Sequence, residues 1–112
     1  VKSVQVIGNV EGKDVIIIDD LIDTGGTISK ASQVIMEKGA NSVRALISHP
    51  VLSGNAEENL ENSALNELVV TDSIPLKFRN KKIKVLSIAG LIAKAIRKIH
   101  ENESTSSLFI NR

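Results

Sequence analysis

The chain has 112 residues, a formal net charge of +1, no cysteine and two phenylalanines as its only aromatic residues. This length allows one domain with a modest core, and the near-neutral charge and scarce aromatic side chains argue against a nucleic acid or an anionic membrane as a partner. The lack of cysteine excludes disulfides and thiolate chemistry and fits a cytoplasmic location, and no apolar run is long enough to span a bilayer.

Two strands are predicted within the first 19 residues. Val4, Val6 and Val10 alternate weakly along the chain, which indicates a short strand. The chain also begins without an initiator methionine, as expected for a piece of a longer protein. Residues 15–18 form a β-branched apolar run after a turn signal, which predicts a strand at 15–19 that is buried on both faces, as in a parallel sheet.

A glycine-containing loop follows this strand and leads into a helical pattern. Gly25 and Gly26 can adopt positive φ, so that successive N–H groups turn inward and form a nest for an anion. The helix that begins at once adds its unpaired N–H groups and its positive dipole end, and Thr24 and Thr27 add hydroxyl donors. The loop is therefore predicted to bind a phosphate, although it lacks the Gly-Lys-Ser/Thr ending of a P-loop.

Three acidic residues, Asp19, Asp20 and Asp23, precede the glycines. Because two unit charges about 4 Å apart repel by roughly 4 kcal/mol at a dielectric of 20, these acids need ligand hydroxyls or a hydrated Mg²⁺ beside the phosphate. A sugar phosphate bound with Mg²⁺ satisfies both needs. Neighbouring strand residues point to opposite sides, so Asp19 and Asp23 are the predicted pair. The alternative is that Asp23, Thr24 or Thr27 simply caps the helix.

The rest of the chain continues to alternate strands and helices. Gly39 is expected to end the first helix, and His49 and His100 are interpreted as residues that close elements rather than as catalysts. Strand, helix and strand in succession imply right-handed parallel crossovers. The predicted elements are a helix at 27–38, a strand at 42–49, a helix at 56–63, strands at 67–71 and 83–86, a helix with one apolar stripe at 87–100, and a tail at 104–110 that forms a strand or a docking segment.

Residues 19–27 resemble the ribose-phosphate loop of the type I phosphoribosyltransferase fold. Segments 49–54, 57–63, 70–75 and 103–109 further resemble the ribose-phosphate diphosphokinases, or PRPP synthetases, and the resemblance extends from Val6 to Ile110. It implies an α/β fold, a three-layer, Rossmann-like parallel-sheet domain. Residues 1–112 would be the C-terminal portion of that domain, truncated at its N-terminal side.

The resemblance also implies an activity. The family transfers the diphosphoryl group of ATP to ribose 5-phosphate and produces PRPP and AMP, with Mg²⁺ required. Carried over by position, Asp19 and Asp20 would contact the ribose hydroxyls and the hydrated metal, and Ser104 and Ser106 would belong to a regulatory phosphate or ADP site between subunits, with Phe109 as an apolar anchor. The residues that would hold the 5-phosphate are Asp23, Thr24, Gly25, Gly26 and Thr27.

In this family the catalytic Lys/Arg loop and the ATP-binding residues lie earlier in the chain, and neither is present among these 112 residues. The chain alone is therefore expected to be inactive. An apolar strand edge exposed by truncation would favour self-association. The family assembles into homo-oligomers, as hexamers at full length.

Three alternatives remain open at this stage. A phosphoribosyltransferase that consumes PRPP would share the loop but not the segments at 49–54 and 103–109. A non-catalytic synthetase-associated subunit is expected to depart more from the acidic loop pattern. A phosphorelay receiver would use Asp72 as phosphoacceptor, but Thr-Gly-Gly-Thr has no use there, Asp20 and Asp72 are far apart, and Ser87 replaces the Lys-Pro pair.

Overall fold

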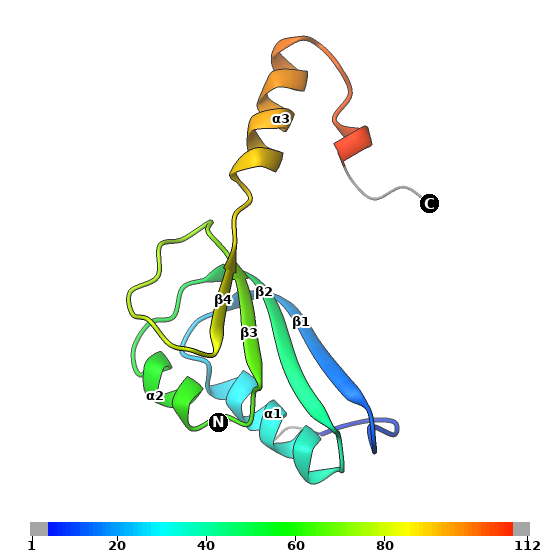
Figure 1. Cartoon of the computed structure of the whole chain (residues 1–112), viewed down its shortest axis with the longest axis vertical. Coiled ribbons are helices and arrows are strands. Elements are labelled where there is room, and N and C mark those ends of the chain that lie inside the picture. Colours follow the sequence, from blue (N-terminus) through cyan, green and yellow to red (C-terminus); the bar gives the residue numbers. More distant parts are fainter. Residues whose placement is uncertain (1–4, 109–112) are drawn as a thin grey trace.

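The chain folds around one parallel sheet whose strands alternate with helices (Figure 1). The structure is a computed structural model that describes residues 5–108. Its elements are β1 (Asp14–Ile22), α1 (Gly26–Glu37), β2 (Ser42–Pro50), α2 (Ala56–Glu61), β3 (Glu67–Thr71), β4 (Ile83–Leu86), α3 (Ala89–His100) and a short 3₁₀ helix, η1 (Ser106–Leu108). The predicted parallel α/β fold is confirmed, and within the described residues no helix is long and apolar enough to cross a membrane.

The sheet has the strand order β1-β2-β3-β4, and all neighbours are parallel. Each strand therefore pairs with the next strand in the chain. Right-handed crossovers that always step in the same direction place their connections on one face of a sheet. In agreement, α1 packs against both β2 and α2.

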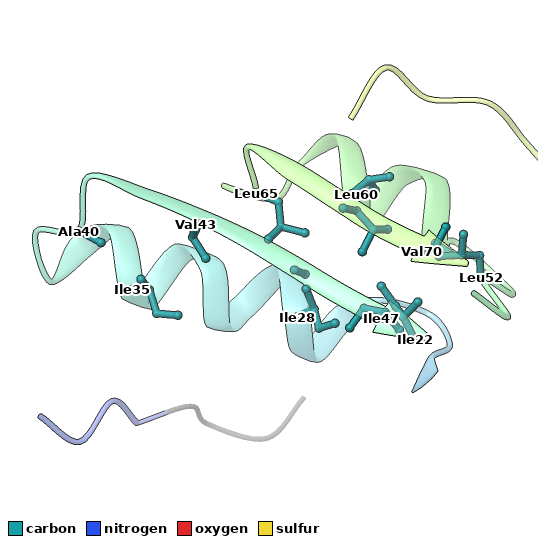
Figure 2. Close-up of a cluster of buried hydrophobic side chains, with 13 residues drawn as sticks. Ile22, Ile28, Ile35, Ala40, Val43, Ile47, Leu52, Leu60, Leu65 and Val70 are labelled. Atoms are coloured by element: carbon teal, nitrogen blue, oxygen red, sulfur yellow. The ribbon is translucent and has the colours of Figure 1, made fainter. Parts of the chain in front are cut away.

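The core lies between this helical layer and the sheet (Figure 2). The side chains that β2 and β3 send toward the helices are almost fully buried, and α1 and α2 meet them with apolar residues. Ser32 is the buried polar residue of this interface; its hydroxyl donates to the Ser29 carbonyl and accepts the N–H of Ala64. The main members are Val43, Ala45, Ile47, Leu68 and Val70 from the strands, and Ile28, Ile35 and Leu60 from the helices.

The opposite face of the sheet is bare within residues 5–108. In β1, Val15 and Ile17 are half-buried, whereas Ile16 is 55% and Ile18 79% exposed. The prediction that residues 15–19 are buried on both faces is therefore wrong for this chain, because both crossover helices cover the same side. Of the expected three layers, the described residues contain two, the sheet and the helices on one face.

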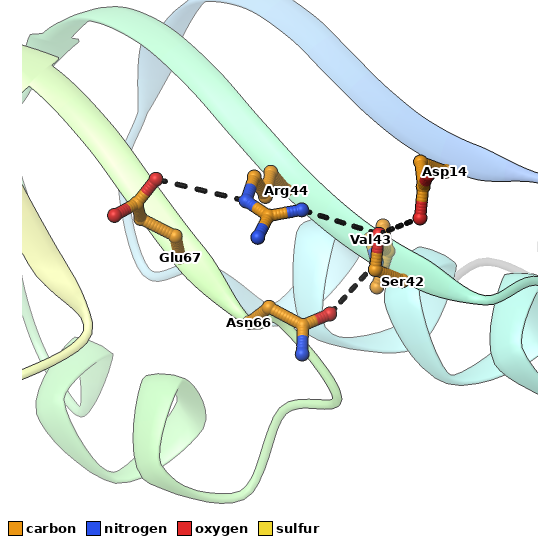
Figure 3. A network of polar contacts seen from close by, with 6 residues as sticks. All are labelled: Asp14, Ser42, Val43, Arg44, Asn66 and Glu67. Atoms are coloured by element: carbon orange, nitrogen blue, oxygen red, sulfur yellow. Dashed lines mark hydrogen bonds and ion pairs between the residues drawn. The ribbon is translucent and has the colours of Figure 1, made fainter.

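A polar network ties the amino ends of β1, β2 and β3 together (Figure 3). The Ser42 hydroxyl donates to the Asp14 carboxylate at 2.7 Å and accepts a hydrogen bond from Arg44 at 3.2 Å. Arg44 also faces Glu67 with 3.7 Å between nitrogen and oxygen. This network lies at the end of the sheet opposite to the glycine loop.

Helix α3 projects away from the sheet (Figure 1), and the molecule is elongated, with extents of 51 × 34 × 24 Å. The radius of gyration is 16.6 Å, against roughly 13 Å expected for a compact chain of this length. The helix is confirmed, but none of its residues is buried. Its stripe, which includes Leu91, Ile92, Ile96 and Ile99, is exposed.

The start of α3 is held by Asp72, which lies just after β3. Its carboxylate accepts a hydrogen bond from the Ile88 N–H at 2.9 Å. This bond and a second one from Ser87 lower the pKa of Asp72 below its ordinary value. Asp72 therefore ties Ile88, the residue before α3, to the end of β3.

Some predicted boundaries differ from the structure. Residues 5–10 form no strand, although Val6 and Val10 pack against the core. The second helix ends at Glu61 rather than at residue 63. Part of the expected tail forms η1, while Phe109 and Ile110 lie outside the described residues. Gly39 follows the first helix with φ 93° and is a helix-ending residue, as predicted.

Candidate functional site

The glycine loop lies at the carboxyl end of β1 and encloses one side of an open cavity of about 270 Å³. This position matches the rule that parallel α/β sheets bind ligands beyond the carboxyl ends of their strands. The volume is at the small end of the range for ligand pockets, which suits a small metabolite. Its lining comprises Asp19, Leu21, Ile22, Asp23, Thr24, Gly25, Gly26, Thr27 and Ile28.

The backbone of the loop has the predicted positive φ at Gly25 but not at Gly26, which is the first residue of α1. Gly25 is the N-cap of α1 and adopts the left-handed conformation, with φ 79° and ψ 3°. No side chain caps this helix start, so the alternative that Asp23, Thr24 or Thr27 caps α1 is not what the structure shows. The nearest approach is a long contact of 3.4 Å from the Gly26 N–H to the Thr24 hydroxyl. The first turn of α1 therefore presents N–H groups and a positive dipole end to the cavity.

The acidic residues separate as their strand positions predict. Asp19 and Asp23 both line the cavity, while Asp20 does not. One oxygen of Asp19 accepts the N–H of Asp20 at 2.8 Å, which helps to fix its side chain. The cavity lining thus combines amide and hydroxyl donors with two carboxylates, a combination suited to a ligand with both a phosphate and hydroxyl groups.

A hydrated magnesium ion fits the donor set of this cavity better than a metal held by the protein alone. Within residues 5–108, no group of three or more metal-ligating side chains comes together. Mg²⁺ is commonly bound through one or two carboxylates, with water and substrate phosphates completing its shell. Asp19 and Asp23 could serve in this way, whereas Asp20 lies outside the lining.

The segment after β2 contacts the loop through residues whose role sequence reasoning missed. The Ser53 hydroxyl donates to the Asp23 carboxylate, and the side-chain amide of Asn59 donates to the Thr24 carbonyl at 2.8 Å. Segment 49–54 contributed to the family resemblance, and Ser53 suggested only loop chemistry. The signal for contact with the loop was that this segment also follows the carboxyl end of a strand.

The other candidates lie elsewhere. His49 is exposed, does not line the cavity, and its Nδ1 lies 2.8 Å from the Ser73 hydroxyl. The hydroxyl oxygens of Ser104 and Ser106 lie 2.9 Å apart in the tail beyond α3. The two serines are therefore close to each other but belong to a different part of the molecule from the glycine loop (Figure 1).

The chain is similar in sequence to a known protein family. The sequence profile of the phosphoribosyl synthetase-associated domain family matches residues 2–110. The chain belongs to this family. This membership leaves no support for a phosphorelay receiver, and Asp72, the phosphoacceptor in that alternative, instead accepts the N–H of Ile88 before α3.

Individual relatives agree with the family. The chain is 60% identical over 105 residues to a ribose-phosphate pyrophosphokinase of Helicobacter hepaticus, which covers 94% of this chain and 34% of the relative. It is 56% identical over 106 residues to one of Wolinella succinogenes, covering 95% of this chain and 34% of the relative. The chain thus spans about a third of the length of these relatives.

A solved structure supports the fold. The crystal structure of phosphoribosylpyrophosphate synthetase from Mycobacterium smegmatis matches with a TM-score of 0.82 and 42% identity. The match covers 86% of this chain and 33% of that protein. The parallel α/β fold is therefore shared with part of a larger protein.

Proposed function

We propose that this chain is the ribose-phosphate-binding part of a ribose-phosphate pyrophosphokinase. The complete enzyme transfers the diphosphoryl group of ATP to ribose 5-phosphate and produces PRPP and AMP. The observation that carries this proposal is the single cavity in which an uncapped helix start with Gly25 in the left-handed conformation faces a pair of carboxylates. Similarity to pyrophosphokinases favours this enzyme over a phosphoribosyltransferase that consumes PRPP.

The roles follow from the donors and acceptors around the cavity. The N–H groups and hydroxyls of residues 24–27 would bind the 5-phosphate, with Asp23 at their edge. Asp19 would accept hydrogen bonds from the ribose hydroxyls. Mg²⁺, when bound, would neutralise phosphate charge, held by Asp19 through water; Asp20 would act only indirectly, because it does not line the cavity.

Transfer of a diphosphoryl group depends on positioning and charge neutralisation rather than on a covalent intermediate. This chain would supply the positioning of ribose 5-phosphate. The cationic groups and the ATP site would come from the remaining part of a protein of the relatives' length, for which this chain would be the C-terminal part. Residues 1–112 alone would therefore bind ribose 5-phosphate without turning it over.

Three further assignments belong to the same proposal. Ser104 and Ser106, whose hydroxyls are neighbours, would contribute to a regulatory phosphate or ADP site between subunits. The protein would act in the cytoplasm as a homo-oligomer. The hexamer expected for the family would require the complete enzyme.

A titration with ribose 5-phosphate tests the proposal directly. Amide chemical shifts of residues 23–27 should change, and the apparent affinity should rise when Mg²⁺ is added. Ribose and inorganic phosphate, each tested alone, should bind more weakly, because each offers only one of the two kinds of group that the cavity can bind. Asp14→Asn, at the opposite end of the sheet, is a matched control for Asp19→Asn. Equal binding by both variants, or no shift at millimolar ligand, would contradict the proposed site.

A further inference from the structure

We propose that Ser53 and Asn59 are positioning residues that hold the phosphate loop in its binding conformation. The inference extends the proposed function and rests on it for the identity of the ligand. Neither side chain belongs to the loop, and neither lines the cavity. Ser53 lies in the loop after β2 and Asn59 lies in α2, within a segment that we call the brace (residues 52–59).

The first support is a set of backbone hydrogen bonds that continues beyond the paired strands. The Leu52 N–H donates to the Ile22 carbonyl, and the Ser53 N–H donates to the Asp23 carbonyl, each at 3.1 Å. Leu52 keeps φ at 50°, which is unusual for a leucine, while its side chain is 3% exposed. Burial of this side chain therefore fixes the brace at the point where it meets the loop.

The second support is a side-chain hydrogen bond to the next carbonyl of the loop. The Asn59 amide donates to the Thr24 carbonyl at 2.8 Å. Three consecutive carbonyls, those of Ile22, Asp23 and Thr24, are thus bound by the brace. Such a run does not occur in an extended strand, where successive carbonyls point to opposite sides.

The bound carbonyls also determine where the N–H groups of the same three peptide bonds point. In a planar trans peptide, the N–H points opposite to the carbonyl. Carbonyls held by the brace therefore direct the N–H groups of Asp23, Thr24 and Gly25 away from it, and none of these three donates to a backbone acceptor within residues 5–108. Consecutive N–H groups with one orientation form an anion nest.

Side-chain packing adds to this orientation. A Cβ atom on Gly54 would lie 3.7 Å from the Thr24 methyl group, so the methyl group packs on the brace. The hydroxyl of Thr24 lies on another side, 3.4 Å from the Gly26 nitrogen. The brace thus fixes both the backbone and the rotamer of Thr24.

Ser53 has an additional effect through Asp23. Its hydroxyl donates to the Asp23 carboxylate, which retains this negative charge at the edge of the loop. Without that bond, Asp23 could rotate toward the N–H groups at the start of α1, where aspartate is a favoured capping residue. The freed carboxylate would then compete with a phosphate for the same donors.

The experiment uses Ser53→Ala and Asn59→Ala in the 112-residue chain, with Ser42→Ala as the matched control. Ser42 also donates to an aspartate, Asp14, but at the far end of the sheet (Figure 3). In the ligand-free protein, the N–H order parameters of residues 23–25 should fall from about 0.85 toward 0.6 in both brace variants and remain unchanged in the control. Unchanged values in both brace variants would overturn the inference.

The ligand measurements separate this inference from the proposed function. Each brace variant should bind ribose 5-phosphate roughly tenfold more weakly, as expected for loss of one hydrogen bond to a charged or oriented group, and Ser53→Thr should restore most of the affinity. Thermal unfolding should be similar in Ser53→Ala and Ser42→Ala. If the wild-type chain fails to bind, the proposed function is wrong; loosened loop amides would still support the brace.

Discussion

The two faces of the sheet differ sharply, although the same four strands supply both. Val43, Ala45 and Ile47 of β2 are no more than 2% exposed, whereas Leu46 between them is 41% exposed. The difference arises from connectivity, because all crossovers step in the same direction and the two that contain a helix place α1 and α2 on the same side of the sheet. Apolar character therefore shows which residues need burial, while the topology decides which of them this chain can bury.

The bare face of the sheet carries a group of exposed apolar side chains. Its exposed apolar side chains include Ile16, Ile18, Leu46 and Leu86. An exposed apolar patch of this kind commonly marks an interface. A second copy of the chain is our proposed partner for this face when the chain is studied alone.

The largest contrast is expected from truncating one leucine on each face. Leu68→Ala on the covered face removes a side chain with no exposed surface and should lower the free energy of unfolding by about 2–5 kcal/mol. Leu46→Ala on the bare face should cost less than about 1 kcal/mol, since water already reaches this side chain. Urea denaturation measures both. Similar losses would mean that the bare face is covered in solution.

Substitution of two glycines compares α1, which covers the sheet, with α3, which projects away from it. Gly25→Ala forces alanine into the left-handed conformation at the start of α1, which should cost about 1–2 kcal/mol. Gly90→Ala lies in α3, where a Cβ would meet nothing within 4 Å, and should stabilise that helix by up to about 1 kcal/mol. Thermal unfolding should therefore shift in opposite directions. A shift in the same direction would contradict the assigned conformations.

A charge on the bare face should weaken self-association. Leu46→Lys places an ammonium group where a second copy would pack, and the dimerisation constant should fall roughly tenfold, or about 1.4 kcal/mol. Gln33→Lys, on the exposed side of α1, adds the same charge on the covered side and is the control. Sedimentation velocity at several concentrations gives the comparison. A wild-type chain that stays monomeric throughout would exclude this use of the face.

The smallest effect is expected at the attachment of α3. The pKa of Asp72 is lowered in the folded chain by hydrogen bonds from Ile88 and Ser87. Its contribution to stability is therefore present above the pKa of the unfolded chain and is lost as pH falls through the lower, folded value. The Ile88 amide should shift on acidification below about pH 4, and Asp72→Asn should abolish that transition. A titration unaffected by Asp72→Asn would assign it to another group.

Local patterns predicted most of the elements. The strands at 67–71 and 83–86 agree with the structure, and the helix predicted at 27–38 spans Gly26–Glu37. These segments carry their own periodicity and end signals, so nothing distant was needed. The burial of residues 15–19 was not predictable in the same way, because it depends on which layers the complete chain provides.

The loop also combines features that its local sequence predicts with contacts that depend on distant residues. Its glycines, threonines and acids fall within residues 19–27, and all of them except Asp20 line one cavity. Ser53 and Asn59 bind loop residues that are 30 and 35 positions away, and a hydroxyl or an amide carries no sign of a distant partner. Only the parallel register of β1 and β2 brings the brace beside the loop.

The strand order also has a consequence for the way the chain acquires its structure. Each strand pairs with the strand that precedes it in the chain, so no strand must wait for a distant segment. Each pairing, such as that of Asp14 with Ser42, still has to close one crossover, and the entropy lost in closing a loop grows slowly with its length. The four strands described here can therefore join the sheet in the order in which they occur in the chain, from β1 to β4.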